Sequence, residues 1–406
     1  MPRAGWVKPE TDQRLSDHIS LGVLTRVFPP DLVDRVVADS GRTEVRHRLL
    51  PARVVVYYVL ALALFSQASY EEVMRNLVDG LSWSTGWARS WRMPSKVALS
   101  KARARLGPEP LQALFGKVAA PLGTPATKGA FYRGWRLMAI DGTCVDLADT
   151  PDNDAAFGRP ATGRGRGVGA FPQLRMVGLA ECGTHALVDV AVGPLAEGEQ
   201  TLAARVLRAL APGMLLAADR GFFSFELWTQ AAQTGAELLW RAKANQDLAV
   251  EEVLEDGSYL SRVYEDANGN RRGKGVPVRV IVYTIDDPGR PQAEDQYRLL
   301  TTILAPGTAP ADELARLYDQ RWEFESLLDE LKTHQRGARV VLRSKLPEGV
   351  LQELYGMLCV HFAIRWLMHT VALDVDEDPD RLSFIHALRV ARRTTASLPG
   401  FSPSDP

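Results

Sequence analysis

The chain has 406 residues, of which 46% are hydrophobic and 24% charged, and its formal net charge at pH 7 is −1. A chain of this length and composition can bury a large core and is expected to form two or three domains. The near-neutral charge excludes a protein that coats DNA indiscriminately. It leaves room for local basic patches, because the field that a phosphate feels is local.

The cysteines and the apolar runs bear on the cellular compartment. Cys144, Cys182 and Cys359 are odd in number and widely spaced, which suits a reducing cytosol and matches no zinc-binding pattern. No signal peptide is evident, and the apolar run 54–65 is too short to span a bilayer, which favours a buried helix. We therefore expect a cytoplasmic protein without membrane contact.

Residues 1 to about 130 are predicted to be helical. One helix is expected over 95–106, where Gly107-Pro108 would stop it. The stretch 89–105, which includes most of this helix, contains basic residues and no acidic ones: Arg89, Arg92, Lys96, Lys101, Arg103 and Arg105. Two interpretations stay open, a helix that places Lys96 and Arg103 on DNA phosphates, and a solvated helix beside a tryptophan-rich packing corner.

From about residue 131 the pattern changes to strand, hairpin, helix, strand, helix and strand. Strands are expected at 137–140, 174–181, 185–192, 214–218 and 237–241, and helices at 199–211 and 225–232. Two of the strands deliver an aspartate just ahead of a glycine. Gly142 should end the first strand and leave Asp141 at its C-terminal edge, and Asp219 follows the strand 214–218 in the same manner. A single aspartate of this kind is usually a turn residue.

The glycine-rich stretch 158–169 lacks the spacing of a phosphate-binding or dinucleotide-binding loop. A flexible loop that lays Arg164 and Arg166 on DNA phosphates is one interpretation, and plain disorder is the other. Further along, residues of about 244–305 hold alternating runs separated by turns, which predicts a mostly β insertion.

The segment from Tyr318 to Lys332 combines a buried stripe with an ordered polar file. In a helix Tyr318, Arg321, Glu325 and Lys332 fall within a sector roughly 60° wide. Leucines and Phe324 form the neighbouring stripe that a core would bury. The third side, which includes Glu323 and Glu330, is expected to face solvent. C-terminal to this segment, a long apolar helix is predicted over 351–373 and a shorter helix over 384–393. The tail after 399 is predicted to be disordered.

Two strand-end aspartates and one helix-borne glutamate make three carboxylates that could converge. Carboxylate oxygens bind hard divalent cations and leave coordination sites for phosphate oxygens. Two such ions activate a water and stabilise the leaving oxygen of a phosphodiester attack.

With these residues the sequence resembles the DDE transposases of bacterial insertion sequences, in the insertion-sequence-four group. That family's signature is Tyr, two residues, Arg, three residues, Glu, six residues and Lys, and Tyr318, Arg321, Glu325 and Lys332 match it at every spacing. Asp141 in Asp-Gly-Thr and Asp219 in Asp-Arg-Gly-Phe stand in the family's contexts for the other metal ligands. The resemblance runs from about residue 15 to about 395.

The resemblance implies an α/β fold in three parts. A helical N-terminal DNA-binding domain would cover 1–130, and an RNase H-like catalytic core with the β insertion would cover 131–345. A helical C-terminal region with a disordered tail would cover 346–406. Activity would be metal-dependent cut-and-paste transposition, with Mg²⁺ as a pair of ions and Mn²⁺ as a substitute. The partners would be the terminal inverted repeats, target DNA and a second copy of the chain.

The resemblance also assigns roles to individual side chains. Asp141, Asp219 and Glu325 would be the catalytic metal ligands. DNA contacts would come from Tyr318, Arg321, Lys332, Arg220, Lys96, Arg103, Arg164 and Arg166. Related enzymes often free the element through a DNA hairpin, a step that needs an aromatic side chain to hold an extruded base, and Tyr297 is the candidate.

Two other functions stay open. A domesticated relative could bind DNA without cutting it, and another RNase H-like nuclease, such as a junction resolvase, could use the same carboxylates. Magnesium-dependent cleavage of end-containing DNA would exclude the first, and strand joining into a second duplex would exclude the second.

Overall fold

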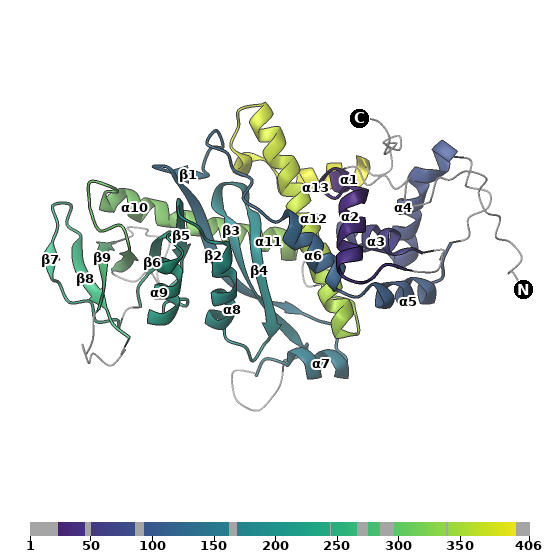
Figure 1. Ribbon diagram of the computed structural model, residues 1–406, viewed down its shortest axis with the longest axis horizontal. Helices are drawn as coiled ribbons and strands as arrows, with labels where there is room; N and C mark the ends of the chain where they lie inside the picture. Colours follow the sequence, from purple (N-terminus) through teal and green to yellow (C-terminus); the bar gives the residue numbers. More distant parts are fainter. Residues whose placement is uncertain are drawn as a thin grey trace, which may run out of the picture.

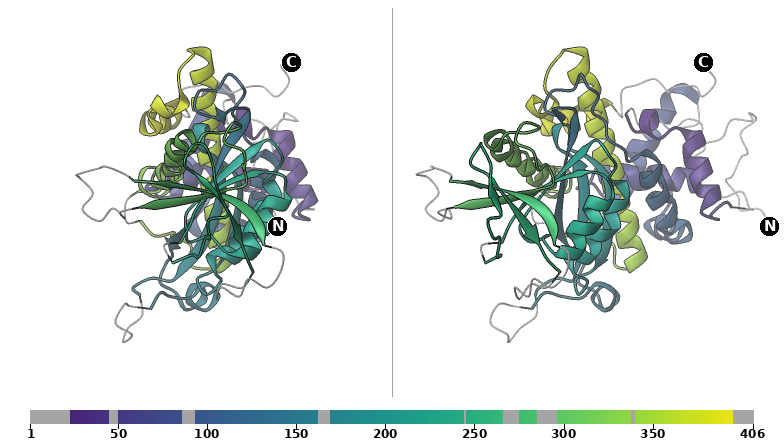
Figure 2. Two further views of the ribbon diagram at one scale, coloured as in Figure 1. Left: turned by 90° about the vertical axis from the view of Figure 1, so that its left-hand side faces the viewer. Right: turned by 60° about the vertical axis from the view of Figure 1, so that its left-hand side comes forward.

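The computed structural model describes residues 23–44, 50–85, 93–161, 169–243, 245–265, 275–284, 296–337 and 340–394. Its long axis runs from a strand-rich end, through a mixed α/β centre, to a helical end that carries the N-terminal elements (Figure 1). Turned by 90°, the strands fan out with the twist that β-sheets share (Figure 2).

One twisted sheet forms the centre. It contains β2 (Trp135–Asp146), β3 (Gln173–Glu181), β4 (Ala186–Pro194), β5 (Met214–Ala218) and β6 (Glu237–Arg241), in the spatial order β4-β3-β2-β5-β6. β2, β5 and β6 are parallel neighbours, whereas β3 pairs antiparallel with both β2 and β4. A short β1 (Phe131–Tyr132) pairs with β2. The predicted strands are confirmed.

The first predicted strand is longer than expected. β2 runs for 12 residues through Asp141 and Gly142, so the expectation that Gly142 ends it is wrong. The reason lies in its two neighbours. The parallel ladder with β5 stops at the pair Ile140 and Ala218, whereas the antiparallel ladder with β3 continues to the pair Asp146 and Gln173. Asp141 therefore lies where one neighbour ends, although its own strand continues.

The insertion is mostly β, as predicted, and it extends the same sheet. β10 (Tyr297–Thr301) pairs antiparallel with β6, followed by β9 (Val276–Tyr283), β8 (Tyr259–Val263) and β7 (Glu252–Val253). Arg279 on β9 is fully buried and donates to Asp256, Ser258 and the carbonyl of Ala309. These bonds connect the insertion to the segment just before α10 (Ala311–Leu317).

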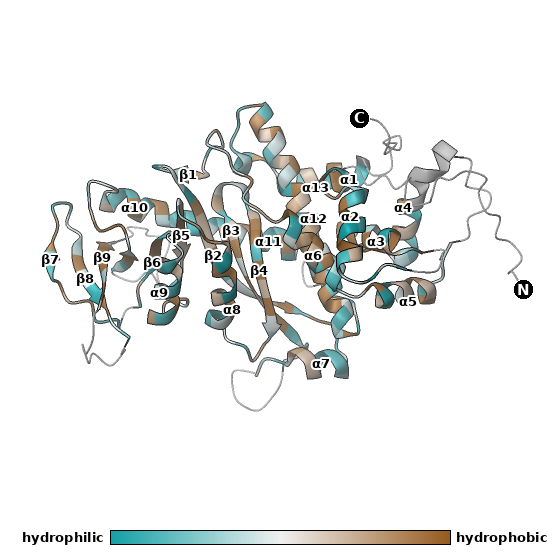
Figure 3. Cartoon of the chain, viewed as in Figure 1, coloured by the Kyte–Doolittle hydropathy of each residue, from teal (hydrophilic) through white to brown (hydrophobic). Residues whose placement is uncertain are grey.

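Alternation along the strands produces two hydrophobic layers. α8 (Glu199–Val206) and α9 (Phe225–Gln233) cover the face that carries Met138, Ile140 and Leu216. The opposite face carries Leu137, Ala139 and Leu215. It is covered by the helical segment 311–335 and by the C-terminal helices. Figure 3 shows the mostly hydrophobic strands behind the hydrophilic outer side of α8. A short α7 (Pro151–Phe157) follows β2, capped by Thr150.

The N-terminal helices are α1 (Val23–Val27), α2 (Pro30–Asp39), α3 (Ala52–Leu64), α4 (Tyr70–Thr85), α5 (Lys96–Leu106) and α6 (Glu109–Val118). They confirm the predicted helical character. α5 is capped by Ser95, whose hydroxyl accepts from the amide of Ala98. α3 packs against the long α12 (Pro347–Asp374). A Cβ on Gly356 would lie 2.9 Å from Val59, so glycine permits this close approach.

α12 is the one helix in the described part of the chain that is long and apolar enough to cross a membrane, and 72% of its apolar window is buried inside the protein. Its residues share one hydrophobic core with α2 to α6 and with the helical segment 311–335. α13 (Phe384–Thr394) packs against the middle of α12, where Phe384 contacts His361 and Arg365. The predicted C-terminal helices are confirmed, and α12 is a core element that joins the N-terminal helices to the sheet.

Arg103 departs from its expected role as a DNA contact. Its side chain is buried, and its guanidinium donates to Gln352, Tyr70, Ser344 and the carbonyl of Gly349. These partners lie mainly on and just before α12, which covers this face of α5. Arg103 is therefore a buried link between the N-terminal and C-terminal helices, and the assignment to DNA is wrong.

We predict that Arg103→Met lowers the free energy of unfolding by about 3 kcal/mol, because Gln352 and Gly349 lose their buried donor. Lys96→Met, on the same helix but exposed, should change it by less than about 0.5 kcal/mol. Urea denaturation of both variants measures the difference. Unchanged stability together with weaker DNA binding in Arg103→Met would contradict the structural role.

Candidate active site

Strand parity places the two aspartates on one face of the sheet. Asp141 continues the odd-numbered side of β2, with Leu137 and Ala139, and Asp219 continues the side of β5 that carries Leu215. Because Ile140 pairs with Ala218, the next residue on each chain is an aspartate at the same level. The sheet register therefore places Asp141 beside Asp219, the first residue after β5.

The third carboxylate comes from the helical segment that crosses this face. It is built from α10 (Ala311–Leu317), the 3₁₀ turn η5 (Tyr318–Arg321), α11 (Trp322–Asp329) and the π-helical turn η6 (Glu330–Gln335). Phe324 is buried against the sheet, and a Cβ on Gly178 would lie 3.1 Å from its ring. Since Gly178 pairs with Asp141, this glycine lets α11 approach the strand at the level of the site.

Arg321 links the carboxylates. One guanidinium nitrogen lies 3.6 Å from a carboxylate oxygen of Asp141, and the other lies 3.2 Å from Glu325. Burial by itself would lower the pKa of Arg321, but Tyr318 and the carboxylates of Asp219, Asp141 and Glu325 raise it. A buried guanidinium that all three carboxylates stabilise shows that they converge on one region.

Asp141 is the carboxylate most affected by its surroundings. Burial raises its pKa to about 6, against the lowering effect of the Gly142 amide and Arg321. Glu325 and Asp219 raise the pKa further because like charges repel. Glu325 and Asp219 are themselves more exposed to solvent. The site thus concentrates negative charge around one partly buried aspartate.

Tyr318 was expected to donate to a phosphate, and the structure places it elsewhere. Its side chain is buried, and its hydroxyl donates to the carbonyl of Ala218 at 3.2 Å. Burial raises the pKa of the phenol. Because Ala218 immediately precedes Asp219, this bond fastens the catalytic segment to the end of β5. Tyr318 therefore positions Asp219, and the expected phosphate contact is not supported.

Lys332 lies in the π-helical turn, half-buried, and its ammonium donates to the hydroxyl of Thr143. Thr143 stands two residues after Asp141 on β2, and therefore on the same face of the sheet. The predicted file of Arg321, Glu325 and Lys332 therefore follows the β2 strand past Asp141. Thr143 was not singled out from the sequence, although its place in Asp-Gly-Thr was a usable signal.

Arg241 and Tyr297 border the site on the β6 side. Arg241 lies 3.9 Å from the Asp219 carboxylate, and its guanidinium stands over the Tyr297 ring at 4.6 Å. Tyr297 also stacks on Tyr283, with ring centroids 5.4 Å apart. The candidate aromatic of the sequence prediction is therefore connected to Asp219 through one arginine. Arg241, which the sequence reading missed, comes from the end of a predicted strand.

The remaining candidate DNA contacts are distributed differently. Arg220 follows Asp219 and is exposed, and Lys96 is exposed at the start of α5, far from the carboxylates along the chain. Arg164 and Arg166 lie outside the described residues. Glu330, expected to face solvent, is buried on the far side of the catalytic helix, where Arg365, His361 and His185 surround it. The reason is that α12 and the β3–β4 turn cover that side.

Comparisons with known proteins decide the family. The model for the insertion element 4 transposase N-terminal region matches residues 18–116, and that for the transposase DDE domain matches residues 133–363. The chain is 30% identical over 379 residues to the Escherichia coli K12 transposase InsG for insertion sequence element IS4, covering 92% of this chain and 83% of the relative. The chain belongs to the insertion element 4 family of DDE transposases.

Two further similarities are weaker. The chain is 25% identical over 251 residues to the putative transposase InsZ of Escherichia coli K12, covering 62% of this chain and 80% of the relative. A solved structure of endonuclease V from Bacillus subtilis matches with a TM-score of 0.21 and 10% identity, over 63% of this chain and 88% of that chain. So low a score carries no structural argument.

Membership of this family makes the chain a transposase, a DNA-binding enzyme of the nuclease and transposase class that depends on a divalent metal. The carboxylates fit such a metal, because their oxygens are the donors that hard cations prefer and Asp141 is partly buried near Glu325 and Asp219. A cation held there would relieve the repulsion that raises the pKa of Asp141.

The raised pKa of Asp141 predicts a pH-dependent stability of the metal-free protein. Since the folded pKa of about 6 exceeds the ordinary aspartate pKa of 3.8, the stability that Asp141 contributes is present below pH 4 and lost as the pH rises through 6. Asp141→Asn should therefore stabilise the protein in EDTA at pH 8 by up to about 3 kcal/mol, and much less at pH 4.5. Thermal melts at both values test this.

Asp39→Asn, an exposed substitution at the end of α2, serves as the control and should show no such gain at pH 8. A gain in Asp141→Asn that is the same at both pH values would show that burial of the charge is not its cause.

Proposed function

We propose that the chain catalyses metal-dependent cut-and-paste DNA transposition, in which it binds terminal inverted repeats, cleaves at the element's ends and joins the 3′ ends to target DNA. The observation that carries the proposal is the convergence of Asp141, Asp219 and Glu325 around Arg321. The order β4-β3-β2-β5-β6, with helices on both faces, supports an RNase H-like core.

Asp141, Asp219 and Glu325 would hold two Mg²⁺ ions, for which Mn²⁺ can substitute. Bound there, the ions would lower the pKa of the attacking water and stabilise the leaving oxygen at the scissile phosphodiester. Asp141 lies close enough to both other carboxylates for each of them to affect its pKa. Oxygen-only ligands favour hard cations of this type.

The basic residues around the carboxylates would hold the DNA backbone. Arg321 can present a planar fork to a phosphate, whereas Lys332 acts as a point charge beside Thr143. Arg220 is exposed next to Asp219 and can reach a neighbouring phosphate. Tyr318 would have no contact with DNA, because its hydroxyl is engaged with Ala218, and it would act only by holding the end of β5.

Tyr297 would hold an extruded base if the element is freed through a hairpin. It lies at the edge of the site, half-buried, on a platform made with Tyr283 and Arg241. Aromatic rings and guanidinium planes both stack on nucleobases. The insertion would thus contribute a side chain to the chemistry as well as extending the sheet.

Recognition of the element's ends must come from contacts other than the carboxylates, because phosphodiesters are alike whatever the sequence. The exposed Lys96, Lys101 and Arg105 on α5 make the N-terminal helices the proposed source. A monomer with one catalytic centre treats one end, so a homodimer would synapse both ends. The proposed location is the bacterial cytoplasm, at the nucleoid.

We predict that Asp141→Asn, Asp219→Asn and Glu325→Gln each reduce cleavage of end-containing DNA by at least about 1000-fold, because each removes a metal-ligand charge. Binding of the same DNA should be largely retained. Asp146→Asn, further along β2 and on the other face, is the matched control and should cleave normally. Full cleavage by any variant of the triad would contradict its assignment.

A second prediction concerns the phosphate clamp. Lys332→Ala should weaken DNA binding and reduce the slope of log K against log salt by about 0.9, the contribution of one phosphate contact. Lys117→Ala, exposed on α6, should leave the slope unchanged. Affinities measured across a salt series decide the matter, and an unchanged slope in Lys332→Ala would remove this lysine from the interface.

Joining of cleaved ends into a second duplex separates the proposal from its alternatives. A non-catalytic DNA-binding protein would neither cut nor join, and a junction resolvase would cut without joining. A strand-transfer assay with labelled element ends and supercoiled target, in Mg²⁺, reports both steps at once.

A further inference from the structure

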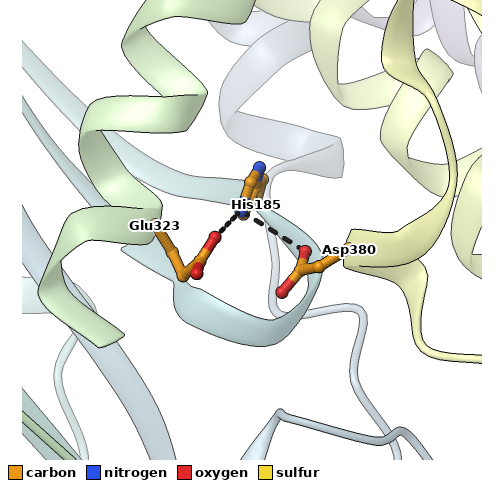
Figure 4. A group of neighbouring side chains, drawn as sticks. All are labelled: His185, Glu323 and Asp380. Carbon is orange, nitrogen blue, oxygen red and sulfur yellow. Dashed lines mark hydrogen bonds and ion pairs between the residues drawn. The ribbon is translucent and has the colours of Figure 1, made fainter. Parts of the chain in front are cut away.

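A second group of metal-ligating side chains lies behind the catalytic helix. His185 comes from the β3–β4 turn, Glu323 from α11, and Asp380 from the turn η7 (Pro379–Arg381) that follows α12. One ligand atom from each lies within 4.8 Å of the others (Figure 4). In the described part of the chain this is the one such group, and the catalytic carboxylates are not part of it.

The distances suit a single small ion. The Nε2 atom of His185 lies 2.9 Å from an oxygen of Glu323 and 3.3 Å from an oxygen of Asp380. In a tetrahedral zinc site, bonds of about 2.0–2.2 Å place neighbouring ligand atoms about 3.3 Å apart. The separation from Asp380 equals such an edge, and the separation from Glu323 is shorter by 0.4 Å and is spanned by a hydrogen bond without an ion. Figure 4 shows both carboxylates turned toward the same side of the imidazole.

The other ring nitrogen has the partner that a metal-bound histidine normally has. Nδ1 of His185 lies 3.2 Å from an oxygen of Glu330 and also contacts the guanidinium of Arg365, and Glu330 is held in turn by Arg365 and His361. Metal-ligating histidines commonly have a carboxylate beside this second nitrogen, which orients the ring. Nε2 is the ring nitrogen that faces Glu323 and Asp380.

The charges point the same way. Arg365 compensates Glu330, which leaves Glu323 and Asp380 with the imidazole as their nearest cationic group. The Asp380 oxygen that lies 3.3 Å from Nε2 is buried and accepts no hydrogen bond. Burial raises the pKa of Asp380 to about 6, His185 lowers it, and Glu323 raises it. A divalent ion would neutralise both carboxylates and satisfy the orphaned oxygen.

We propose that His185, Glu323 and Asp380 bind a structural divalent transition-metal ion of the zinc class, separate from the catalytic ions. An imidazole ligand favours zinc over magnesium, whereas the oxygen-only catalytic site favours magnesium. The ion would fasten α11 to the β3–β4 turn and to η7. Because Glu323 precedes Glu325 by two residues, this link would also hold the catalytic glutamate in place.

The experiment separates this site from the catalytic one by using the full chain with Asp141→Asn and Glu325→Gln as the background. Bound Zn²⁺ is counted by elemental analysis after desalting, with Mg²⁺ in excess, and Co²⁺ is added to the metal-free protein to record its visible spectrum. We expect about one Zn²⁺ per chain, a tetrahedral-type Co²⁺ spectrum and a higher melting temperature with Zn²⁺.

Variants on this background assign the ligands. His185→Ala and Asp380→Asn should lose the bound Zn²⁺ and the Co²⁺ spectrum. Glu330 contacts His185 only at Nδ1, so Glu330→Gln should weaken the affinity for Zn²⁺ by about 10–100-fold. His386→Ala, an exposed histidine on α13, is the matched control and should bind as the background does. Circular dichroism verifies that each variant is folded.

Two results would overturn the proposal. One is the failure of the background protein to bind Zn²⁺ in a one-to-one ratio, a result that needs no further substitution. His185 would then be an imidazolium shared by the two carboxylates. The other is full Zn²⁺ retention in folded His185→Ala. Neither result bears on cleavage by the wild-type chain, so failure here is distinguishable from failure of the proposed transposition chemistry.

Discussion

The active site depends on holding three mutually repelling carboxylates on one face of a sheet. Burial raises the pKa of Asp141 to about 6, and Glu325 and Asp219 add to the effect. Arg321 is the counter-charge within the protein, in contact with Asp141 and Glu325. The surrounding scaffold must therefore resist the tendency of these groups to move apart. Parallel pairing of β2 and β5 supplies that resistance for the aspartates, and the bond from Tyr318 to Ala218 extends it to the helix.

The catalytic helix is fixed from two sides. Toward the sheet, Phe324 packs where Gly178 has no side chain, so α11 approaches at the level of Asp141. Away from the sheet, Glu330 is held by Arg365, His361 and His185, which belong to α12 and the β3–β4 turn. Burying a carboxylate is unfavourable unless it is paired, and Arg365 provides the pair. The same α12 packs on α3 and accepts the buried Arg103 link. α12 thus connects the N-terminal helices with the segment that carries Glu325 and Glu330.

Agreement between sequence and structure follows the range of the interactions involved. The strands 214–218 and 237–241, the helix 95–106 and the long helix of 351–373 depend on neighbours along the chain, and their prediction holds. Errors arose where a distant segment decides. Gly142 fails to end β2 because β3 continues beside it, and Arg103 is buried because α12 covers it. Glu330 looked solvent-facing because the helical pattern contains no information about what packs on the far side.

By itself the sequence determined the element types, the three carboxylates and the order of Tyr318, Arg321, Glu325 and Lys332, because periodicity and spacing are local properties of the chain. The family followed from the same spacing. Only the tertiary structure decided which of these side chains meet. The ladder between β2 and β5 sets Asp141 beside Asp219, and the path of the catalytic segment commits Tyr318 to a carbonyl rather than to solvent. The His185, Glu323 and Asp380 group lies beyond any local pattern, because its members are more than fifty residues apart along the chain and meet only through packing.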